Sequence, residues 1–212
     1  MKKFYSCIKR IMDIILSVIA LIILSPILLV VSIAIKIDSK GPVIFKQERI
    51  GKNGKVFKIY KFRSMVVGAE KKGTGVYSDK NDARVTKVGK FIRATSIDEL
   101  PQLVNILKGE MSFIGPRPVL TYHPWKYEEY TEEQLKRFIV RPGVTGLAQI
   151  NGRKQVEWNK RIEYDVEYVE NISFILDLKI FFKTIYKVLL MKDNVNTSET
   201  VKEEQKDEQK VG

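Results

Sequence analysis

An uncharged apolar run near the N-terminus constrains the fold more than any other feature of the sequence. Residues 14–35 read IILSVIALIILSPILLVVSIAI, 22 residues without a charge. At about 1.5 Å of rise per residue, a helix of this length can cross the hydrocarbon core of a bilayer. The run is longer than the apolar part of a typical secretory signal peptide, and no small-residue cleavage site follows it. We therefore expect the segment to be retained and to contact a membrane.

Ser25 and Pro26 interrupt this run near its centre. Proline removes one helix hydrogen bond and crowds the preceding turn, so we expect a kink, and the Ser25 hydroxyl can satisfy a carbonyl that the kink frees. Two topologies remain open: a kinked helix that crosses the bilayer, and a re-entrant hairpin that enters and leaves by the same face. Basic residues flank both ends, so the positive-inside rule gives no clear orientation. These basic residues are Lys2, Lys3, Lys9, Arg10, Lys36 and Lys40.

Arg10 and Asp13 stand at the entrance to the apolar run, three residues apart. On a helix, side chains at this spacing are neighbours and can form an ion pair. We expect this pair to anchor the entrance at the level of the lipid headgroups.

The chain is basic, with 37 Lys and Arg against 25 Asp and Glu and a formal net charge of +12. Such a charge favours an anionic partner, which could be nucleic acid, anionic lipid or a phosphate-bearing substrate. Cys7 and His123 are the only residues of their types, which excludes an internal disulfide, a cysteine-based zinc site and a histidine-rich metal site. Any metal must therefore be held by oxygen ligands, which favours Mg²⁺ or Mn²⁺.

The rest of the chain predicts a mixture of one hairpin and several helices. Two β-rich runs within residues 42–65 flank the turn signal Asn53-Gly54, which predicts a β-hairpin. A short helix followed by a second one over 97–108, with Gly109 as its terminating residue, is expected next. Further helices are expected over 126–138, 156–170 and 174–191, with loops over 116–124 and 140–153, and a polar, disordered tail over 192–212.

The last of these helices is amphipathic. Lys179, Lys183 and Lys187 repeat on one face, and apolar residues fill much of the remainder. That pattern suits a helix that lies in the membrane interface with its lysines toward the headgroups. It also suits a helix that faces a protein core, and the sequence leaves both interpretations open. The apolar residues are Leu178, Phe181, Phe182, Ile185 and Leu189.

The segment SIDELPQL, residues 96–103, places two carboxylates side by side. Ser96 and Glu99 match a helix capping box, in which Asp98 would simply complement the helix dipole. Pro101 would then lie inside the helix, where its ring and its missing N–H are unfavourable. Such conflicts between local rules tend to occur at functional sites, so Asp98 and Glu99 become candidate catalytic residues.

Several basic residues in turn-rich segments surround this acidic pair in the sequence. Arginine presents a planar fork that matches phosphate oxygens. A carboxylate among phosphate ligands can attack phosphorus and carry an acyl phosphate, a divalent cation can offset the repulsion, and a second carboxylate can act as a base. The candidate phosphate or nucleotide ligands are Lys61, Arg63, Arg93, Arg117 and Arg141.

With these motifs in order, the chain resembles the bacterial sugar transferases, specifically the small monotopic phosphoglycosyl transferases that start glycan assembly on polyprenol phosphate. The resemblance covers residues 5–190 and rests on KRIMD, on the SP pair, on GPVIFKQERIGKNGKVFKIYKFRSM, on TKVGKFIRATSIDELPQLVNILKGEMSFIGPRP and on RPGVTGLAQINGR. It implies that Asp98 is the nucleophile that attacks the β-phosphate of a UDP-sugar and releases UMP. Glu99 is then its partner in the dyad, Mg²⁺ binds beside Asp98, and the basic residues contact phosphate or nucleotide.

The resemblance also favours the re-entrant hairpin and the cytoplasmic face of a bacterial inner membrane. The predicted fold is α+β and mostly helical: a membrane hairpin over 1–40, a catalytic domain with a β-hairpin and interfacial helices over 41–191, and the tail over 192–212. The implied partners are a UDP-sugar, polyprenol phosphate and membrane lipids, without nucleic acid. The lack of a large N-terminal extension favours N-acetylated or diacetamido sugars over hexoses.

A membrane-anchored basic module without catalytic activity, binding anionic lipid or nucleic acid, is the alternative. The net charge fits it, but the acidic pair does not, because two carboxylates would weaken anion binding.

Overall fold

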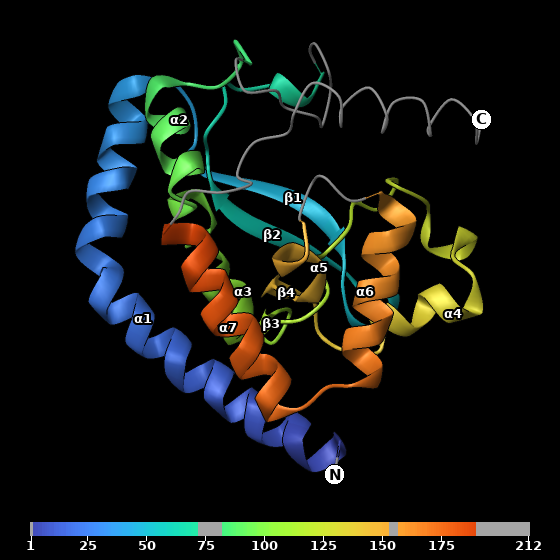
Figure 1. The fold of residues 1–212 in the computed structure, drawn as a ribbon. Coiled ribbons are helices and arrows are strands. Elements are labelled where there is room, and N and C mark those ends of the chain that lie inside the picture. The colour runs from blue at the N-terminus through green and yellow to red at the C-terminus, as the bar shows by residue number, and fades with distance from the viewer. Residues whose placement is uncertain (1, 72–81, 153–156, 190–212) are drawn as a thin grey trace.

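The computed structural model describes residues 2–71, 82–152 and 157–189. It is an α+β fold in which helices dominate, as the sequence predicted. The first helix, α1 (Lys2–Asp38), curves around the side of the molecule formed by α2 (Lys87–Ala94), α3 (Gln102–Lys108) and α7 (Phe174–Leu189) (Figure 1). The hairpin of β1 (Ile44–Ile50) and β2 (Val56–Phe62) lies between these helices and α6 (Trp158–Glu170).

The sequence left a kinked helix and a re-entrant hairpin open, and the resemblance favoured the hairpin, with a break between two helices. The structure has one helix that contains Pro26 and bends. Pro26 has no N–H to donate to the carbonyl of Ile22, four residues earlier. The Ser25 hydroxyl donates to that carbonyl instead, at 2.8 Å, which confirms the compensation expected from the sequence. Among the described residues, α1 is the one helix long and apolar enough to cross a membrane.

One side of α1 packs on the rest of the chain along most of its length. Ser17, Val31 and Ile35 are buried, and Ala20 and Leu24 pack on the core cluster of α3 and β2. The opposite side is apolar and exposed to solvent. Its most exposed members include Ile22, Ile23, Leu29 and Val30, each between 63% and 68% exposed.

The ion pair predicted between Arg10 and Asp13 does not form, because each side chain makes its hydrogen bonds to the domain instead. The Arg10 guanidinium donates to the backbone oxygens of Ile106 and Leu107, at 2.6 and 3.0 Å, and so serves the end of α3. Asp13 accepts from the Ser112 hydroxyl and from the backbone N–H of Phe113. Helix ends expose carbonyls that need donors, so an arginine nearby finds a partner there as readily as in a carboxylate.

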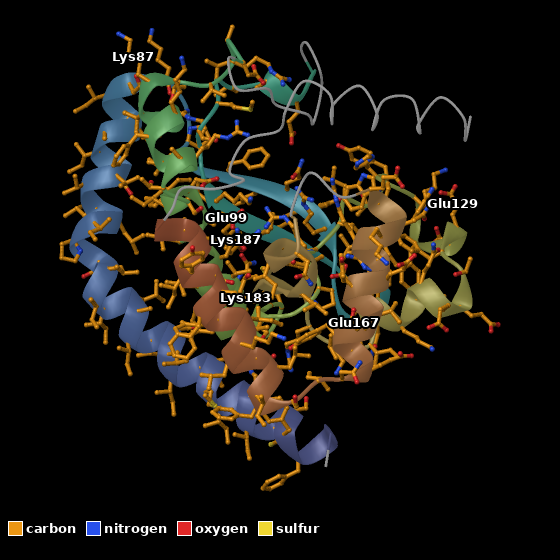
Figure 2. All side chains as sticks on the ribbon, viewed as in Figure 1. Lys87, Glu99, Glu129, Glu167, Lys183 and Lys187 are labelled. Carbon is orange, nitrogen blue, oxygen red and sulfur yellow. The ribbon has the colours of Figure 1, made fainter. Side chains whose placement is uncertain are left out.

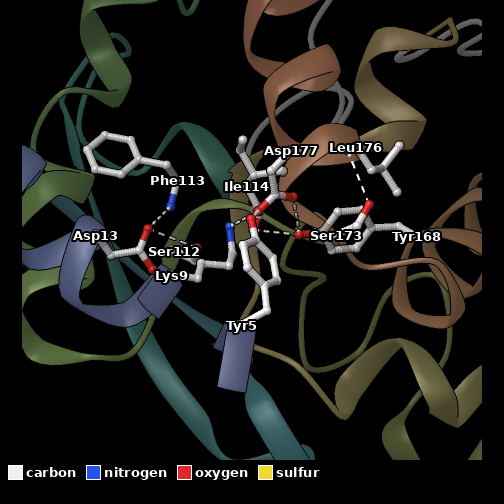
Figure 3. A network of polar contacts seen from close by, with 10 residues as sticks. All are labelled: Tyr5, Lys9, Asp13, Ser112, Phe113, Ile114, Tyr168, Ser173, Leu176 and Asp177. Atoms are coloured by element: carbon white, nitrogen blue, oxygen red, sulfur yellow. Dashed lines mark hydrogen bonds and ion pairs between the residues drawn. The ribbon is translucent and has the colours of Figure 1, made fainter. Parts of the chain in front are cut away.

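A buried polar network fastens the start of α1 to α7 (Figure 3). Asp177 accepts hydrogen bonds from Tyr5, Lys9 and Tyr168, each at 2.7 Å. These residues come from α1, α6 and α7, so the network joins the N-terminal helix to two C-terminal helices that are distant from it in the sequence.

The predicted β-hairpin is confirmed. β1 pairs with β2 in antiparallel register from Ile44↔Phe62 to Ile50↔Val56. Asn53 and Gly54 turn the chain with φ values of 54° and 75°. That is the left-handed region in which Asn and Gly are most easily accommodated, so the turn residues fix the register.

The segment 140–153, predicted as a loop, contains a strand and a short helix. β4 (Gly143–Thr145) pairs in parallel with β3 (Ser112–Ile114), and α5 (Leu147–Ile150) follows. A Cβ on Gly143 would lie 2.1 Å from the backbone nitrogen of Gly115. The glycines in this segment therefore permit close backbone packing, which sequence patterns do not distinguish from an irregular loop.

The remaining elements agree with prediction in kind, although their bounds differ. α6 and α7 occupy the two C-terminal helices expected, whereas residues 126–138 form three short pieces: η4 (Tyr127–Glu129), α4 (Glu132–Leu135) and η5 (Lys136–Phe138). On α7, Phe181 and Phe182 are 46% and 60% exposed, while Ile180 is buried. The structure thus leaves most of the apolar face of α7 uncovered. The predicted tail lies outside the described residues.

Candidate active site

The acidic pair lies on a tight turn between α2 and α3. Ser96 has a φ of 59° and makes no side-chain cap, and Ile97–Glu99 form a single 3-10 turn. The capping-box prediction is therefore wrong. α3 begins at Gln102, after Pro101, because proline is tolerated at a helix start and not in its interior. A left-handed conformation at a residue other than glycine is unfavourable, and such residues are concentrated at functional sites.

Glu99 is held in place by two cations. Its Oε1 accepts from Lys61 Nζ at 2.7 Å and from Arg117 Nη2 at 2.9 Å. Burial alone would raise the pKa of Glu99, but Lys61 and Arg117 overcome that effect and hold the pKa below its usual range. The carboxylate is thus ionised and oriented. In Figure 2, Glu99 lies near the middle of the view, whereas Lys87 and Glu129 lie at its edges.

Asp98 has a different environment, although it is the adjacent residue. Burial raises the pKa of Asp98 to about 6, the charge of Glu99 adds to this, and Lys61 and Arg93 oppose it. No hydrogen bond or ion pair joins its carboxylate to any residue that the structure describes. The dyad therefore combines one fixed carboxylate with one whose oxygens are available to a ligand.

Three of the five predicted phosphate ligands meet at this dyad. Lys61 from β2, Arg93 from α2 and Arg117 from the loop after β3 all line the same cleft as Asp98 and Glu99. Arg93 is mostly buried, and its Nη1 has no hydrogen-bond partner within the described parts of the chain. Burial lowers the pKa of Arg93, while the charge of Asp98 opposes that effect. The three cations outnumber the two carboxylates of the dyad. The positive charge that remains favours a polyanionic ligand.

The other two predicted ligands serve helix ends. The Arg63 guanidinium donates to the backbone oxygens of Lys40 and Ser39 at 2.7 Å and so ends α1, although Arg63 also borders the cleft. Arg141 donates through Nε to the backbone oxygen of Gly109 at 2.8 Å, at the end of α3. Neither guanidinium is paired with the dyad, so the geometry gives both a structural role.

The cleft has a volume of about 740 Å³ and extends beyond the dyad on the hairpin side. Gln47 and Arg49, which the sequence analysis missed, line it from β1. Arg49 donates to Gln47 Oε1 and to the backbone oxygen of Pro118. The alternation of side chains along a strand could have identified both residues. In the hairpin register Phe45 pairs with Lys61, and side chains two residues apart point to the same face, so Gln47 and Arg49 share the face of Lys61.

The same cleft is lined by four further polar residues that the sequence analysis missed, which we call the second polar cluster: the buried Arg137, Gln149 and Asp165 and the partly buried Trp158. Arg137 and Asp165 form an ion pair at 2.6 Å with both side chains only 2% exposed. No spacing rule predicts this pair, since Asp165 resembles any polar residue on an amphipathic helix.

A metal ion could be held at the dyad only with help from a ligand. Among the described residues there is no group of three or more His, Cys, Asp or Glu side chains that could hold a metal. The unengaged Asp98 carboxylate offers the kind of oxygen donor that Mg²⁺ binds. Mg²⁺ commonly takes one or two carboxylates and completes its coordination with substrate phosphates and water. The donor set fits a metal that is shared with a phosphate substrate.

Comparison with known proteins adds independent information. A family model described as bacterial sugar transferase matches residues 4–191. The UDP-glucose:undecaprenyl-phosphate glucose-1-phosphate transferase of Klebsiella pneumoniae is 51% identical over 87% of this chain and 40% of its own length. An uncharacterized sugar transferase, EpsL of Bacillus subtilis, is 46% identical over 86% of this chain and 87% of its own length. The UDP-N-acetylgalactosamine-undecaprenyl-phosphate N-acetylgalactosaminephosphotransferase of Aeromonas hydrophila is 45% identical over 87% of this chain and 44% of its own length. The chain thus spans less than half of the first and third of these relatives.

Proposed function

The chain belongs to the bacterial sugar transferase family, and we propose that it transfers a sugar 1-phosphate from a UDP-sugar to polyprenol phosphate with release of UMP. The observation that carries the proposal is the asymmetry of the dyad. Asp98 has free carboxylate oxygens among Lys61, Arg93 and Arg117, whereas Glu99 is locked by two of these cations. This arrangement suits one nucleophile and one orienting residue.

In the first step, a carboxylate oxygen of Asp98 attacks the β-phosphorus of the UDP-sugar. The bond from that phosphorus to the bridging oxygen breaks, UMP leaves with the bonding electrons, and the sugar phosphate stays on Asp98 as an acyl phosphate. Lys61, Arg93 and Arg117 stabilise the charge that develops on the phosphate oxygens. When bound at Asp98 and the diphosphate, Mg²⁺ would add Lewis-acid stabilisation of the same charge.

In the second step, a phosphate oxygen of polyprenol phosphate attacks the same phosphorus. The bond to Asp98 breaks, the carboxylate is restored, and the product is a polyprenol diphosphate sugar. A phosphate monoester is mostly dianionic at neutral pH, so this step needs no strong base. Because the pKa of Glu99 is held low, Glu99 suits the orientation of Lys61 and Arg117 better than proton removal.

The packing of α1 supports a monotopic placement, in which the chain enters one face of the membrane without crossing it. Lys9 near one end and Ile35 near the other both contact the same domain, and the outer side of α1 is apolar. A helix that crossed the bilayer would carry these contacts into the hydrocarbon. The exposed apolar face of α7 supports the same placement at the interface. We place the domain on the cytoplasmic side of the inner membrane, where UDP-sugars are made.

Release of UMP tests the proposed reaction. Detergent-solubilised protein is supplied with polyprenol phosphate and a panel of UDP-sugars that includes hexoses, N-acetylated sugars and a diacetamido sugar. We expect many equivalents of UMP per protein with acceptor and at most one without it. Without acceptor, the phosphosugar stays on Asp98 and prevents a second turnover. No UMP from any donor would favour the non-catalytic basic module. Relatives named for glucose and for N-acetylgalactosamine make both sugar classes necessary in the panel.

Metal removal gives a second expected result. After treatment with EDTA and removal of the chelator, UMP release should fall to background and return with Mg²⁺ or Mn²⁺, since hard cations prefer carboxylate and phosphate oxygens. The control is restoration attempted with Ca²⁺, which is larger and tolerates irregular coordination. Full activity in excess EDTA would remove the metal from the proposal.

Replacement of Ser25 and Pro26 by alanine should shift part of the protein toward a spanning topology. The change restores a helix hydrogen bond and about 3 kcal/mol of helix propensity at the proline, which straightens the apolar run. The N-terminal Lys9 and Arg10 resist transfer across the membrane, so the shift should be partial. The measurement is labelling of Lys3→Cys, in a Cys7→Ser background, by a membrane-impermeant thiol reagent on intact cells.

Lysed cells provide the control for that labelling, since the cysteine must then react in both proteins. Labelling of the protein with intact Ser25 and Pro26 from outside whole cells would contradict the monotopic placement directly. Equal protection of both proteins would show that the Ser-Pro pair does not decide the topology.

A further inference from the structure

The second polar cluster lies directly beside the phosphate-binding part of the cleft. Arg137 Nη2 donates to the backbone oxygen of Arg117 at 2.9 Å, and the Arg117 side chain is paired with Glu99. Gln149 from α5 and Trp158 and Asp165 from α6 line the same cleft. A ligand whose phosphates reach Lys61 and Arg117 therefore extends naturally toward this cluster.

The cluster contains an unusual number of buried polar atoms without partners. Gln149 is 6% exposed, and neither its Nε2 nor its Oε1 makes a hydrogen bond within the described parts of the chain. The same holds for Arg137 Nη1, Trp158 Nε1 and Asp165 Oδ1. Buried polar atoms in native proteins nearly always have partners, so five such atoms on one wall of a cleft indicate a ligand that satisfies them.

The charge of the cluster limits the chemistry of that ligand. Arg137 and Asp165 neutralise each other at 2.6 Å, and Gln149 and Trp158 are uncharged. By contrast, Lys61, Arg93 and Arg117 gather positive charge near the dyad. The cleft thus divides into a strongly cationic part at the dyad, which suits phosphates, and a less charged part around the cluster, where Arg161 also lines the cleft, which suits a polar, uncharged group.

We propose that the second polar cluster binds the uridine of the donor, with the Gln149 amide facing the edge of the uracil base. This inference rests on the proposed function. A glutamine amide presents a donor and an acceptor side by side, which complements the adjacent N3–H and carbonyl of uracil. Asp165 Oδ1 and Arg137 Nη1 supply an acceptor and a donor for the ribose hydroxyls. The Trp158 indole, with the Arg161 guanidinium 4.6 Å from its ring centroid, offers a planar surface for the base.

The position of the cluster favours the nucleoside over the sugar. In Figure 1, α6 lies on the far side of the β1–β2 hairpin from the middle of α1. The sugar phosphate remains on Asp98 and passes to a lipid that arrives from the membrane side, whereas UMP must leave into water. The end of the donor that points away from α1 is therefore the nucleotide end.

Binding of UMP and N3-methyl-UMP to the purified full-length protein tests this assignment without turnover. The methyl group removes the N3–H donor and its bulk keeps the amide away from the adjacent carbonyl, so the unaltered protein should bind UMP about tenfold more tightly than the methylated analogue, as expected for two lost hydrogen bonds. Gln149→Leu should weaken UMP by about tenfold and bring the ratio of the two affinities close to one. Gln149→Asn, which withdraws the amide by one carbon, should lower the ratio in the same direction.

Two comparisons keep the result specific. Gln47→Leu changes a glutamine on β1, whose amide is engaged by Arg49 and Glu70, and should leave the ratio unaltered. Affinity for ribose 5-phosphate, which lacks the base, should be the same in Gln149→Leu as in the unaltered protein and shows that the site is folded. An unaltered ratio in both Gln149 variants overturns the assignment.

The assignment is also overturned if the Gln149 variants change the preference among UDP-sugars while their affinity for UMP is unaffected. The cluster would then hold the sugar. Failure of the proposed function gives a different pattern, because the unaltered protein would then release no UMP from any donor whatever the Gln149 variants bind.

Discussion

Asp98→Asn is expected to abolish transfer and to prevent the covalent adduct. An amide oxygen is a far weaker nucleophile than a carboxylate and cannot form the acyl phosphate, so turnover should fall by at least about a thousandfold. The measurement is the mass of the intact protein after exposure to UDP-sugar without polyprenol phosphate. The unaltered protein should gain the mass of one phosphosugar, and Asp98→Asn should gain none.

Glu99→Gln is the matched control, because it makes the same carboxylate-to-amide change at the adjacent residue. It removes the charge that orients Lys61 and Arg117 but leaves the nucleophile in place. This variant should form the adduct slowly, whereas Asp98→Asn should not form it at all. An adduct that persists in Asp98→Asn would place the nucleophile elsewhere in the chain.

The conflict of local rules at SIDELPQL singled out an acidic pair that lines the cleft, but it predicted the local structure of that segment wrongly. A serine followed by glutamate three residues later favours a helix start, but Pro101 delays α3 to Gln102. Ser96 then takes a left-handed conformation, which leaves both carboxylates on a turn. Sequence patterns describe helix propensity well, while an unfavourable conformation at one residue depends on the packing around it.

The hairpin and the long helices were predictable because the sequence patterns that specify them are local. Asn53-Gly54 specifies the turn, and helical periodicity specifies α6 and α7. The parallel pair of β3 and β4 was not predictable, because strands of three residues carry too little pattern and their partners lie about thirty residues apart.

Basic residues were the least predictable part of the site. Three of them meet at the dyad: Lys61, Arg93 and Arg117. Three other arginines instead donate hydrogen bonds to backbone carbonyls at the C-terminal ends of helices: Arg10, Arg63 and Arg141. Arginine binds a phosphate and the last carbonyls of a helix with the same donors. Which of the two it meets depends on tertiary structure, so motif position alone could not separate them.

The buried pair of Arg137 and Asp165 leads to the second large expected effect. Asp165→Ala leaves the Arg137 guanidinium without its counter-charge in a site that is only 2% exposed. Removal of one partner of a buried ion pair typically costs about 3–5 kcal/mol, because the remaining charge is uncompensated. For a chain of this size that corresponds to a fall in Tm of roughly 6–20 °C. Thermal unfolding in detergent or in lipid nanodiscs measures it.

Glu163→Ala provides the control on the same helix, since Glu163 pairs with Lys160 where both side chains are more than half exposed. Exposed pairs contribute little to stability, so its Tm should hardly change. The double variant Arg137→Met/Asp165→Leu should recover much of the loss, because apolar groups of similar volume need no counter-charge. Transfer activity should not recover with it, since Arg137 also holds the backbone of Arg117 at 2.9 Å. Equal Tm values for Asp165→Ala and Glu163→Ala would show that the buried pair does not stabilise the fold.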